Sequence, residues 1–231
     1  ILDNLIAEGK AKEMILVLPY GNPTLLKTER QPAAQGGGFG GFGMFGGYNF
    51  NKDFVEVLMP FIEKNYRTIN DADHRGIGGF SRGGNQGLSI GLANLDKFSY
   101  LCSYSSFTQI RPNQFENADS INARIHLFWS GIGTDDFLYG NSKDLMNILD
   151  KNGIKNIKEF TYDKFGHTWM NARYWLDKSF RLLFQDQSVI DAEKGMSLEE
   201  AEKVREASAA GGEESRLTPA LMANLFPAGV K

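Results

Sequence analysis

The sequence contains a single cysteine and three histidines among its 231 residues, and it has no long apolar run. One thiol, Cys102, excludes an internal disulfide, and its apolar surroundings indicate a small buried side chain. Because no apolar run approaches the length of a membrane-spanning helix, we expect no membrane partner. The formal net charge is only −3 and no basic stripe stands out, which argues against a nucleic-acid partner.

Metal-binding and phosphate-binding patterns are also missing. No Cys/His spacing typical of a metal site and no phosphate loop occurs, so we expect neither a metal nor an organic cofactor. The chain length fits one domain with a sizeable core and an appendage. There is no signal peptide, and since the sequence starts at Ile1 the compartment cannot be read from this N-terminus.

The most informative stretch is Arg75–Gly91, RGIGGFSRGGNQGLSIG. Its first six residues have the composition of a short buried strand, Ser81 follows in a G-x-S-x-G pattern, and residues 84–93 read as a helix. This order predicts a nucleophile elbow, a tight turn that lifts a serine hydroxyl above the sheet edge. Glycine is expected at Gly79 and Gly83 because side chains there would collide with the neighbouring strand and helix. The alternative is a glycine-rich turn with an incidental serine, which the flanking elements disfavour.

The rest of the chain alternates between strand and helix patterns. Strands are predicted at residues 13–18, 98–104, 124–129 and 157–162, and helices at 1–8, 52–66, 142–151 and 169–184. Pro60 should kink or break the helix that contains it. The alternation predicts an α/β domain with a mostly parallel sheet flanked by helices.

Two segments fall outside this alternation. Residues 20–50 include GGGFGGFGMFGGY, which we interpret as a flexible low-complexity loop. The alternative is a mobile aromatic flap, because the loop leaves the carboxyl end of a predicted strand. Residues 187–231 contain the capping box Ser197–Glu200 and are expected to form a C-terminal helical tail or linker. The predicted domains are therefore residues 1–186 and residues 187–231.

A serine nucleophile needs a base, usually a histidine. His74 lies in a polar turn and His126 in a predicted strand, where structural roles are favoured. His167 follows the last predicted strand, at the carboxyl edge of the sheet, which also carries the elbow. The sequence therefore indicates His167 as the base.

The base in turn needs an orienting carboxylate, and this acid should follow the preceding strand. Asp135 and Asp136 both do so, in the segment GIGTDD. Either one completes the order serine, acid, histidine that is typical of α/β hydrolases, and the residues alone leave the choice open. Asp163 is a weaker candidate because it is too close in sequence to the histidine loop.

The chain contains DNLIAEGK (3–10), LMPFIEKNY (58–66), HRGIGGFSRGG (74–84), IGLANLDKFSY (90–100), GTDDFL (133–138) and GHTW (166–169). In these segments it resembles the feruloyl esterase modules of bacterial xylanases, in the carbohydrate-esterase branch of the esterase D-like α/β hydrolases. The resemblance implies an α/β-hydrolase fold for residues 1–186 and the triad Ser81, Asp136 and His167. It also implies an ester-substituted plant polysaccharide as partner and a secreted or periplasmic location.

Two departures from that family affect the oxyanion hole. Arg82 stands where the family usually has methionine, but its backbone N–H can still donate to an oxyanion. Relatives also carry several strands and a His-Gly loop, the source of the second donor, before the DNLIAEGK segment. We therefore expect an N-terminally truncated fold, unless the sequence is a fragment or a second chain completes the sheet.

These observations predict a serine carboxylesterase that removes feruloyl groups from arabinoxylan through an acyl-enzyme. The alternatives are an acetylxylan or general short-acyl esterase, and a catalytically weak carbohydrate-binding module that lacks a full oxyanion hole. Trp169 and Tyr20 are candidates for stacking on an aromatic acyl group, although core packing is an equal alternative for each.

Overall fold

The computed structural model describes residues 1–19, 50–110 and 114–193. The chain divides into two compact units, one formed by Ile1–Glu13 with Asp71–Lys231 and the other by Met14–Asn70. The predicted glycine-rich loop, Tyr20 and nearly all of the predicted tail lie outside the described residues.

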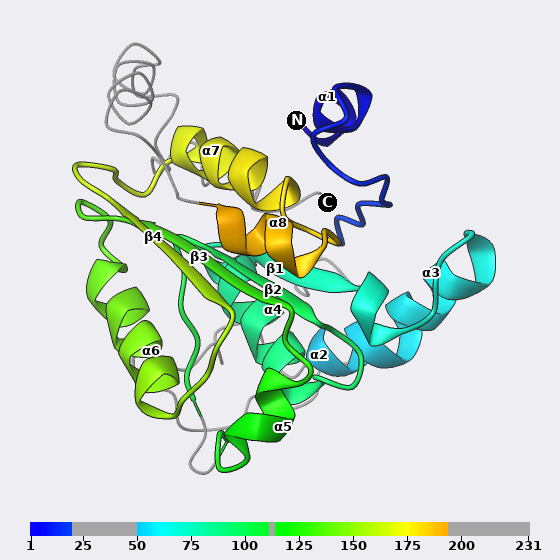
Figure 1. Cartoon of the computed structure of the whole chain (residues 1–231), viewed down its shortest axis with the longest axis horizontal. Helices are drawn as coiled ribbons and strands as arrows, with labels where there is room; N and C mark the ends of the chain where they lie inside the picture. Colours follow the sequence, from blue (N-terminus) through cyan, green and yellow to red (C-terminus); the bar gives the residue numbers. More distant parts are fainter. Residues whose placement is uncertain (20–49, 111–113, 194–231) are drawn as a thin grey trace, which may run out of the picture. The chain divides into compact units, whose positions relative to one another are not determined.

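The first unit contains a sheet of four parallel strands: β1 (Gly76–Phe80), β2 (Tyr100–Tyr104), β3 (Leu127–Gly133) and β4 (Ile157–Tyr162) (Figure 1). Their order in the sheet is their order in the sequence. All carboxyl ends therefore meet at one edge, which is where parallel sheets position functional loops. The predicted α/β class with a parallel sheet is confirmed.

Helices cover both faces of this sheet (Figure 1). The crossovers contain α4 (Arg82–Ala93), α5 (Ala118–Asn122) and α6 (Tyr139–Lys151), and α4 and α6 lie on one face. Right-handed crossovers between successive neighbouring strands dictate this placement. The chain then changes face, and α7 (Trp169–Phe180) and α8 (Gln187–Ala192) lie on the other side. The N-terminal helix α1 (Leu2–Ala7) packs against α7.

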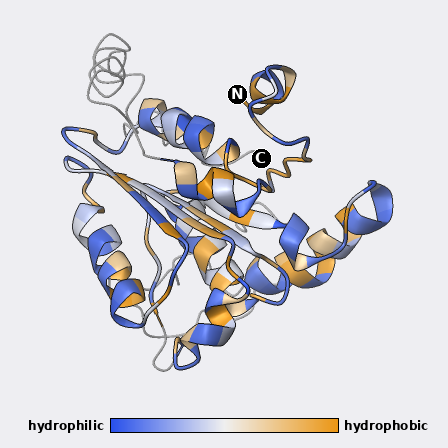
Figure 2. Ribbon diagram, in the orientation of Figure 1, coloured by the Kyte–Doolittle hydropathy of each residue, from blue (hydrophilic) through white to orange (hydrophobic). Residues whose placement is uncertain are grey.

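The core is centred on β3, all seven residues of which are buried. Trp129 of this strand packs against Phe160 of β4 and Trp175 of α7, with ring centroids 5.1 and 5.9 Å apart. Figure 2 shows hydrophobic residues along the strands and on the inner side of α6. None of the described helices combines the length and the apolar character that crossing a membrane requires.

Several element boundaries differ from the prediction. β3 begins and ends later than the predicted strand at 124–129. The later end was missed because it includes Gly131 and Gly133, and glycine is unfavourable in an ordinary strand. A Cβ at Gly131 would overlap the rings of Trp129 and Trp175, and one at Gly133 would overlap the backbone of Phe165. Glycine at these two positions therefore allows neighbouring side chains and backbone to pack closely against β3. No helix is predicted at α5, whereas α8 lies at the start of the segment expected to form a helical tail or linker.

In the described part of the second unit, residues 50–65 form one interrupted helix. It consists of α2 (Phe50–Asp53), a π-helical segment η3 (Phe54–Leu58) and α3 (Met59–Asn65), and it corresponds to the helix predicted at 52–66. Pro60 lies in the first turn of α3. Because proline has no N–H to donate, the hydrogen-bond register changes directly before it. The kink or break predicted at Pro60 corresponds to this change of helix type, and the helix continues to Asn65.

The prediction of a strand at residues 13–18 is wrong. Residues 12–19 have no regular secondary structure, and the apolar side chains there are exposed, Leu18 at 82%. A strand needs a hydrogen-bonded neighbour for its backbone, and none of the described strands pairs with this segment. The apolar pattern alone could not reveal that requirement.

Cys102 lies within β2 and is buried, as predicted, and burial raises the pKa of its thiol to about 12. We expect native protein to resist a thiol-specific disulfide reagent at about pH 8, where an ordinary thiol is partly ionised. Denaturant should then expose one reactive thiol per chain. Spectrophotometric thiol titration measures both states, and rapid stoichiometric reaction of the native protein would contradict the buried position.

Candidate active site

Ser81 is the single residue between the end of β1 and the start of α4. Its backbone has φ 55° and ψ −122°, a conformation that is strained for any residue except glycine. Its N–H donates to the carbonyl oxygen of Tyr104 at 3.0 Å, and its own carbonyl accepts from Ser106 Oγ at 2.6 Å. The tight turn between strand and helix is therefore present, and the segment that leaves β2 holds both backbone groups of Ser81.

Glycines allow α4 to approach β1 at this turn. A Cβ at Gly79 would come within 2.5 Å of the backbone of Gly83, and one at Gly84 within 2.5 Å of Ser106 Cβ. A Cβ at Gly83 would meet no described atom within 4 Å. The collision expected at Gly79 is therefore confirmed, whereas the one expected at Gly83 is wrong. The second tightly packed glycine is Gly84.

His167 and Asp136 form a buried pair at the same edge of the sheet. His167 Nδ1 lies 2.9 Å from Asp136 Oδ2 and 3.1 Å from Oδ1, and the two side chains are 7% and 0% exposed. An ionised carboxylate can only accept hydrogen bonds, so Nδ1 carries the proton and Nε2 of the neutral ring keeps its lone pair. Nε2 is buried and has no hydrogen-bond partner among the described residues.

Backbone hydrogen bonds tie the two loops that carry this pair. Thr134 N–H donates to the carbonyl of Tyr162 at 2.9 Å, and Asp135 N–H donates to that of Phe165 at 3.1 Å. The buried Asn171 of α7 donates through Nδ2 to the carbonyl of Gly166 at 2.6 Å. The position of His167 is therefore fixed by its own loop, by the loop after β3 and by α7.

Aromatic contacts connect the imidazole to the elbow. The ring of Phe80, the residue before Ser81, lies 4.6 Å from the His167 ring and 4.9 Å from that of Trp169, centroid to centroid. Phe137 also contacts the imidazole at 4.6 Å. The base candidate thus packs directly against the residue that precedes the nucleophile candidate.

The remaining candidates lie as follows. Arg82 is the first residue of α4, so its N–H lies in the first turn of that helix. Trp169 is the first residue of α7 and is partly exposed. Tyr20 lies outside the described residues. Asp135 and Asp163 are both exposed, so the two adjacent carboxylates at 135 and 136 are clearly distinguished.

Sequence reasoning missed Ser106 and Phe137. Ser106 could not be found, because a buried serine in a polar loop gives no pattern of its own. Phe137 carried a weak signal, since it is an aromatic residue directly after a candidate acid at the functional edge of the sheet.

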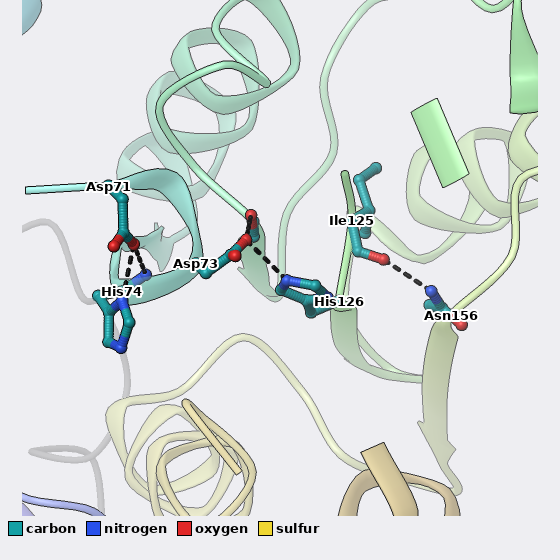
Figure 3. A network of polar contacts seen from close by, with 7 residues as sticks. Asp71, Asp73, His74, Ile125, His126 and Asn156 are labelled. Carbon is teal, nitrogen blue, oxygen red and sulfur yellow. Dashed lines mark hydrogen bonds and ion pairs between the residues drawn. The ribbon is translucent and has the colours of Figure 1, made fainter. Parts of the chain in front are cut away.

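The other two histidines form pairs at the opposite edge of the sheet (Figure 3). His74 Nδ1 lies 2.6 Å from Asp71 Oδ1, and His126 Nε2 lies 2.8 Å from Asp73 Oδ1. Both pairs are exposed. The first lies within the turn before β1, and the second joins that turn to the residue before β3, which fits the structural roles predicted for the two histidines. No cluster suited to a metal ion occurs among residues 1–19, 50–110 and 114–193.

The family model described as "Putative esterase" matches residues 1–209. The chain belongs to this family. Two curated relatives of the chain are much longer proteins. It is 28% identical over 185 residues, 80% of its length, to an endo-1,4-beta-xylanase/feruloyl esterase of Xylanibacter ruminicola. It is 25% identical over 160 residues, 61% of its length, to endo-1,4-beta-xylanase Y of Acetivibrio thermocellus. The matches span only 23% and 13% of those proteins.

Solved structures of esterases share the fold of this chain. A ferulic acid esterase is 25% identical with a TM-score of 0.60, over 79% of this chain and 74% of the other. The ferulic acid esterase of Anaeromyces mucronatus, solved with ferulic acid, is 21% identical with a TM-score of 0.59, over 78% and 69% of the two chains. These likenesses confirm the α/β-hydrolase fold that the sequence predicted.

The contrast between the elbow glycines gives a matched pair of variants. Gly79→Ala should destabilise this family member by about 1–3 kcal/mol, because the new methyl group overlaps backbone atoms. Gly83→Ala should be neutral or stabilising by up to about 1 kcal/mol, because the methyl group meets no described atom and alanine favours a helix. Denaturant unfolding of both variants measures the difference. Equal losses of stability would contradict the packing at the elbow.

Proposed function

We propose that the chain is a serine carboxylesterase that hydrolyses feruloyl esters on plant cell-wall arabinoxylan, with Ser81 as nucleophile, His167 as base and Asp136 as orienting acid. The main support is the buried Asp136–His167 pair, whose Nε2 has no hydrogen-bond partner among the described residues and whose ring packs on the residue before Ser81. A buried nitrogen without a hydrogen-bond partner lowers the stability of the fold, and a catalytic role would explain why it is present.

The proposed reaction begins when Ser81 Oγ attacks the ester carbonyl carbon and passes its proton to His167 Nε2. Asp136 accepts the hydrogen bond from Nδ1–H and stabilises the imidazolium that forms. The Arg82 N–H, at the start of α4, donates to the oxyanion, where the helix dipole also favours negative charge. Oγ and Nε2 form no hydrogen bond in this structure. Such contacts are often long in the absence of substrate and tighten when it binds.

The tetrahedral intermediate then collapses into an acyl-enzyme. The bond from the carbonyl carbon to the leaving oxygen breaks, and His167 gives its proton to that oxygen, which releases the sugar alcohol. A water molecule, deprotonated by His167, attacks the acyl carbon, and Ser81 leaves with the proton. The overall reaction converts one ester and one water molecule into a carboxylic acid and an alcohol, and it needs no other reactant.

The choice of a feruloyl substrate is supported by the relatives and by the aromatic side chains at the site. One curated relative is named a xylanase/feruloyl esterase, and a solved relative holds ferulic acid. Trp169, in ring contact with Phe80, offers an aromatic surface to a planar acyl group. Because one curated relative is a xylanase as well as a feruloyl esterase, the proposal includes a secreted or periplasmic location.

A fluorophosphonate probe tests the nucleophile. We expect stoichiometric labelling of folded wild-type protein at Ser81, because the probe reacts with activated serines, and no labelling of Ser81→Ala. The same substitution should lower turnover of ethyl ferulate by about 10⁴-fold or more. Intact-mass spectrometry and product assay measure the two effects. Folded wild-type protein that neither labels nor turns over the ester would refute the proposal.

The adjacent carboxylates provide a second test with an internal control. Asp136→Asn should lower kcat for ethyl ferulate by roughly 10³–10⁴-fold, because an amide at this position can hold the wrong imidazole tautomer. Asp135→Asn removes the charge of an exposed neighbour and should change kcat less than about threefold. Steady-state kinetics on the two variants checks this. A larger loss in Asp135→Asn would assign the acid to the other residue.

A further inference from the structure

Phe137 directly follows the buried Asp136 and is 73% exposed, more than any other aromatic side chain that the structure describes. Leaving such a ring in water forgoes about 1.5–3 kcal/mol that burial would provide. Its backbone is nevertheless fixed, since Leu138 N–H donates to Asp136 Oδ1 at 2.8 Å and Tyr139 N–H to the Asp136 carbonyl at 2.9 Å. Rigidly presented aromatic rings of this kind are frequent anchors in binding sites.

The position of the ring relative to the base decides what it can bind. Phe137 contacts the His167 imidazole at 4.6 Å with 47° between the planes, and this is its only ring contact among the described residues. Trp169, in contrast, contacts Phe80. Of these two exposed aromatic side chains next to the site, Phe137 is the one with a described ring contact to the imidazole of the base.

The reaction places the alcohol part of the substrate on the side of the base. His167 must deliver a proton to the leaving oxygen, so that oxygen comes within about 3 Å of Nε2 in the reacting complex. A ring packed on the imidazole is therefore next to the leaving group. A pentose has an apolar C–H face and a rim of hydroxyl groups. It can cover an exposed aromatic ring while its hydroxyl groups remain in water.

We propose that Phe137 is a specificity-determining residue that binds the pentose ring of the leaving alcohol. This inference rests on the proposed function and adds to it the recognition of the sugar side of the substrate. A small alcohol such as methanol is too short to cover the Phe137 ring, so Phe137 should contribute less to kcat/KM for simple alkyl esters than for sugar esters.

Two substrates with the same acyl group test this assignment: methyl ferulate and a feruloylated arabino-oligosaccharide. Phe137→Leu should lower kcat/KM for the oligosaccharide, mainly through KM, by about three- to tenfold more than it lowers kcat/KM for methyl ferulate. Phe137→Tyr, which keeps the aromatic face, should retain the preference for the oligosaccharide. Ile148→Ala, which shortens an exposed apolar side chain near the far end of α6, is the control and should change neither rate.

Other outcomes separate the inference from the proposed function. Equal losses on both esters, or a shifted pH–rate profile on methyl ferulate, would show that Phe137 acts on the imidazole and would overturn the inference alone. An unchanged preference in Phe137→Leu would overturn it too. A wild-type chain that hydrolyses neither ester would overturn the proposed function and the inference together. Thermal unfolding of each variant establishes that it is folded before the rates are compared.

Discussion

The strained backbone of Ser81 is the constraint on which the rest of the site depends. A non-glycine residue in this conformation costs of the order of 1–3 kcal/mol. The hydrogen bonds to Tyr104 and Ser106 contribute about 0.5–1.5 kcal/mol each, so together they are comparable with the strain. Close packing of α4 on β1 adds to them, since a Cβ at Gly87 would lie only 3.1 Å from the backbone of Gly78. The strain persists because the end of β2 and the first turns of α4 both enforce it.

The parallel order of the strands gives this strained turn its chemical neighbours. Asp136 follows β3 and His167 follows β4, and backbone hydrogen bonds between the two loops bring both residues to the edge at which β1 ends. A fully buried carboxylate needs partners for its charge, and Asp136 has the imidazole and the Leu138 N–H. The pair is therefore a product of the topology, because it forms only when β3 and β4 are neighbours in register.

The sequence predicted the features that follow from local rules. The elbow, the parallel sheet and the irregular helix at Pro60 could all be read from glycine, proline and apolar spacing. Features that depend on distant partners could not. The apolar run at residues 13–18 is no strand because no described strand pairs with it, and glycine at Gly133 serves a contact with Phe165 that lies over thirty residues away. Asp136 could be selected over Asp135 only through resemblance, since the backbone of the loop decides which of the two points inward.

Three histidine–aspartate pairs in one chain show why distance alone does not identify a catalytic site. Their N–O separations are 2.6, 2.8 and 2.9 Å, and the proposed catalytic pair has the longest. The pairs of His74 and His126 are exposed, where water screens the charges and such pairs contribute about 0–1 kcal/mol. The pair of His167 is buried, where desolvation offsets much of the attraction, so stability is a poor explanation for it. Its second nitrogen is also buried without a described partner, which adds a cost that catalysis would explain. Burial and an available lone pair, rather than a short contact, therefore distinguish His167 as the proposed base.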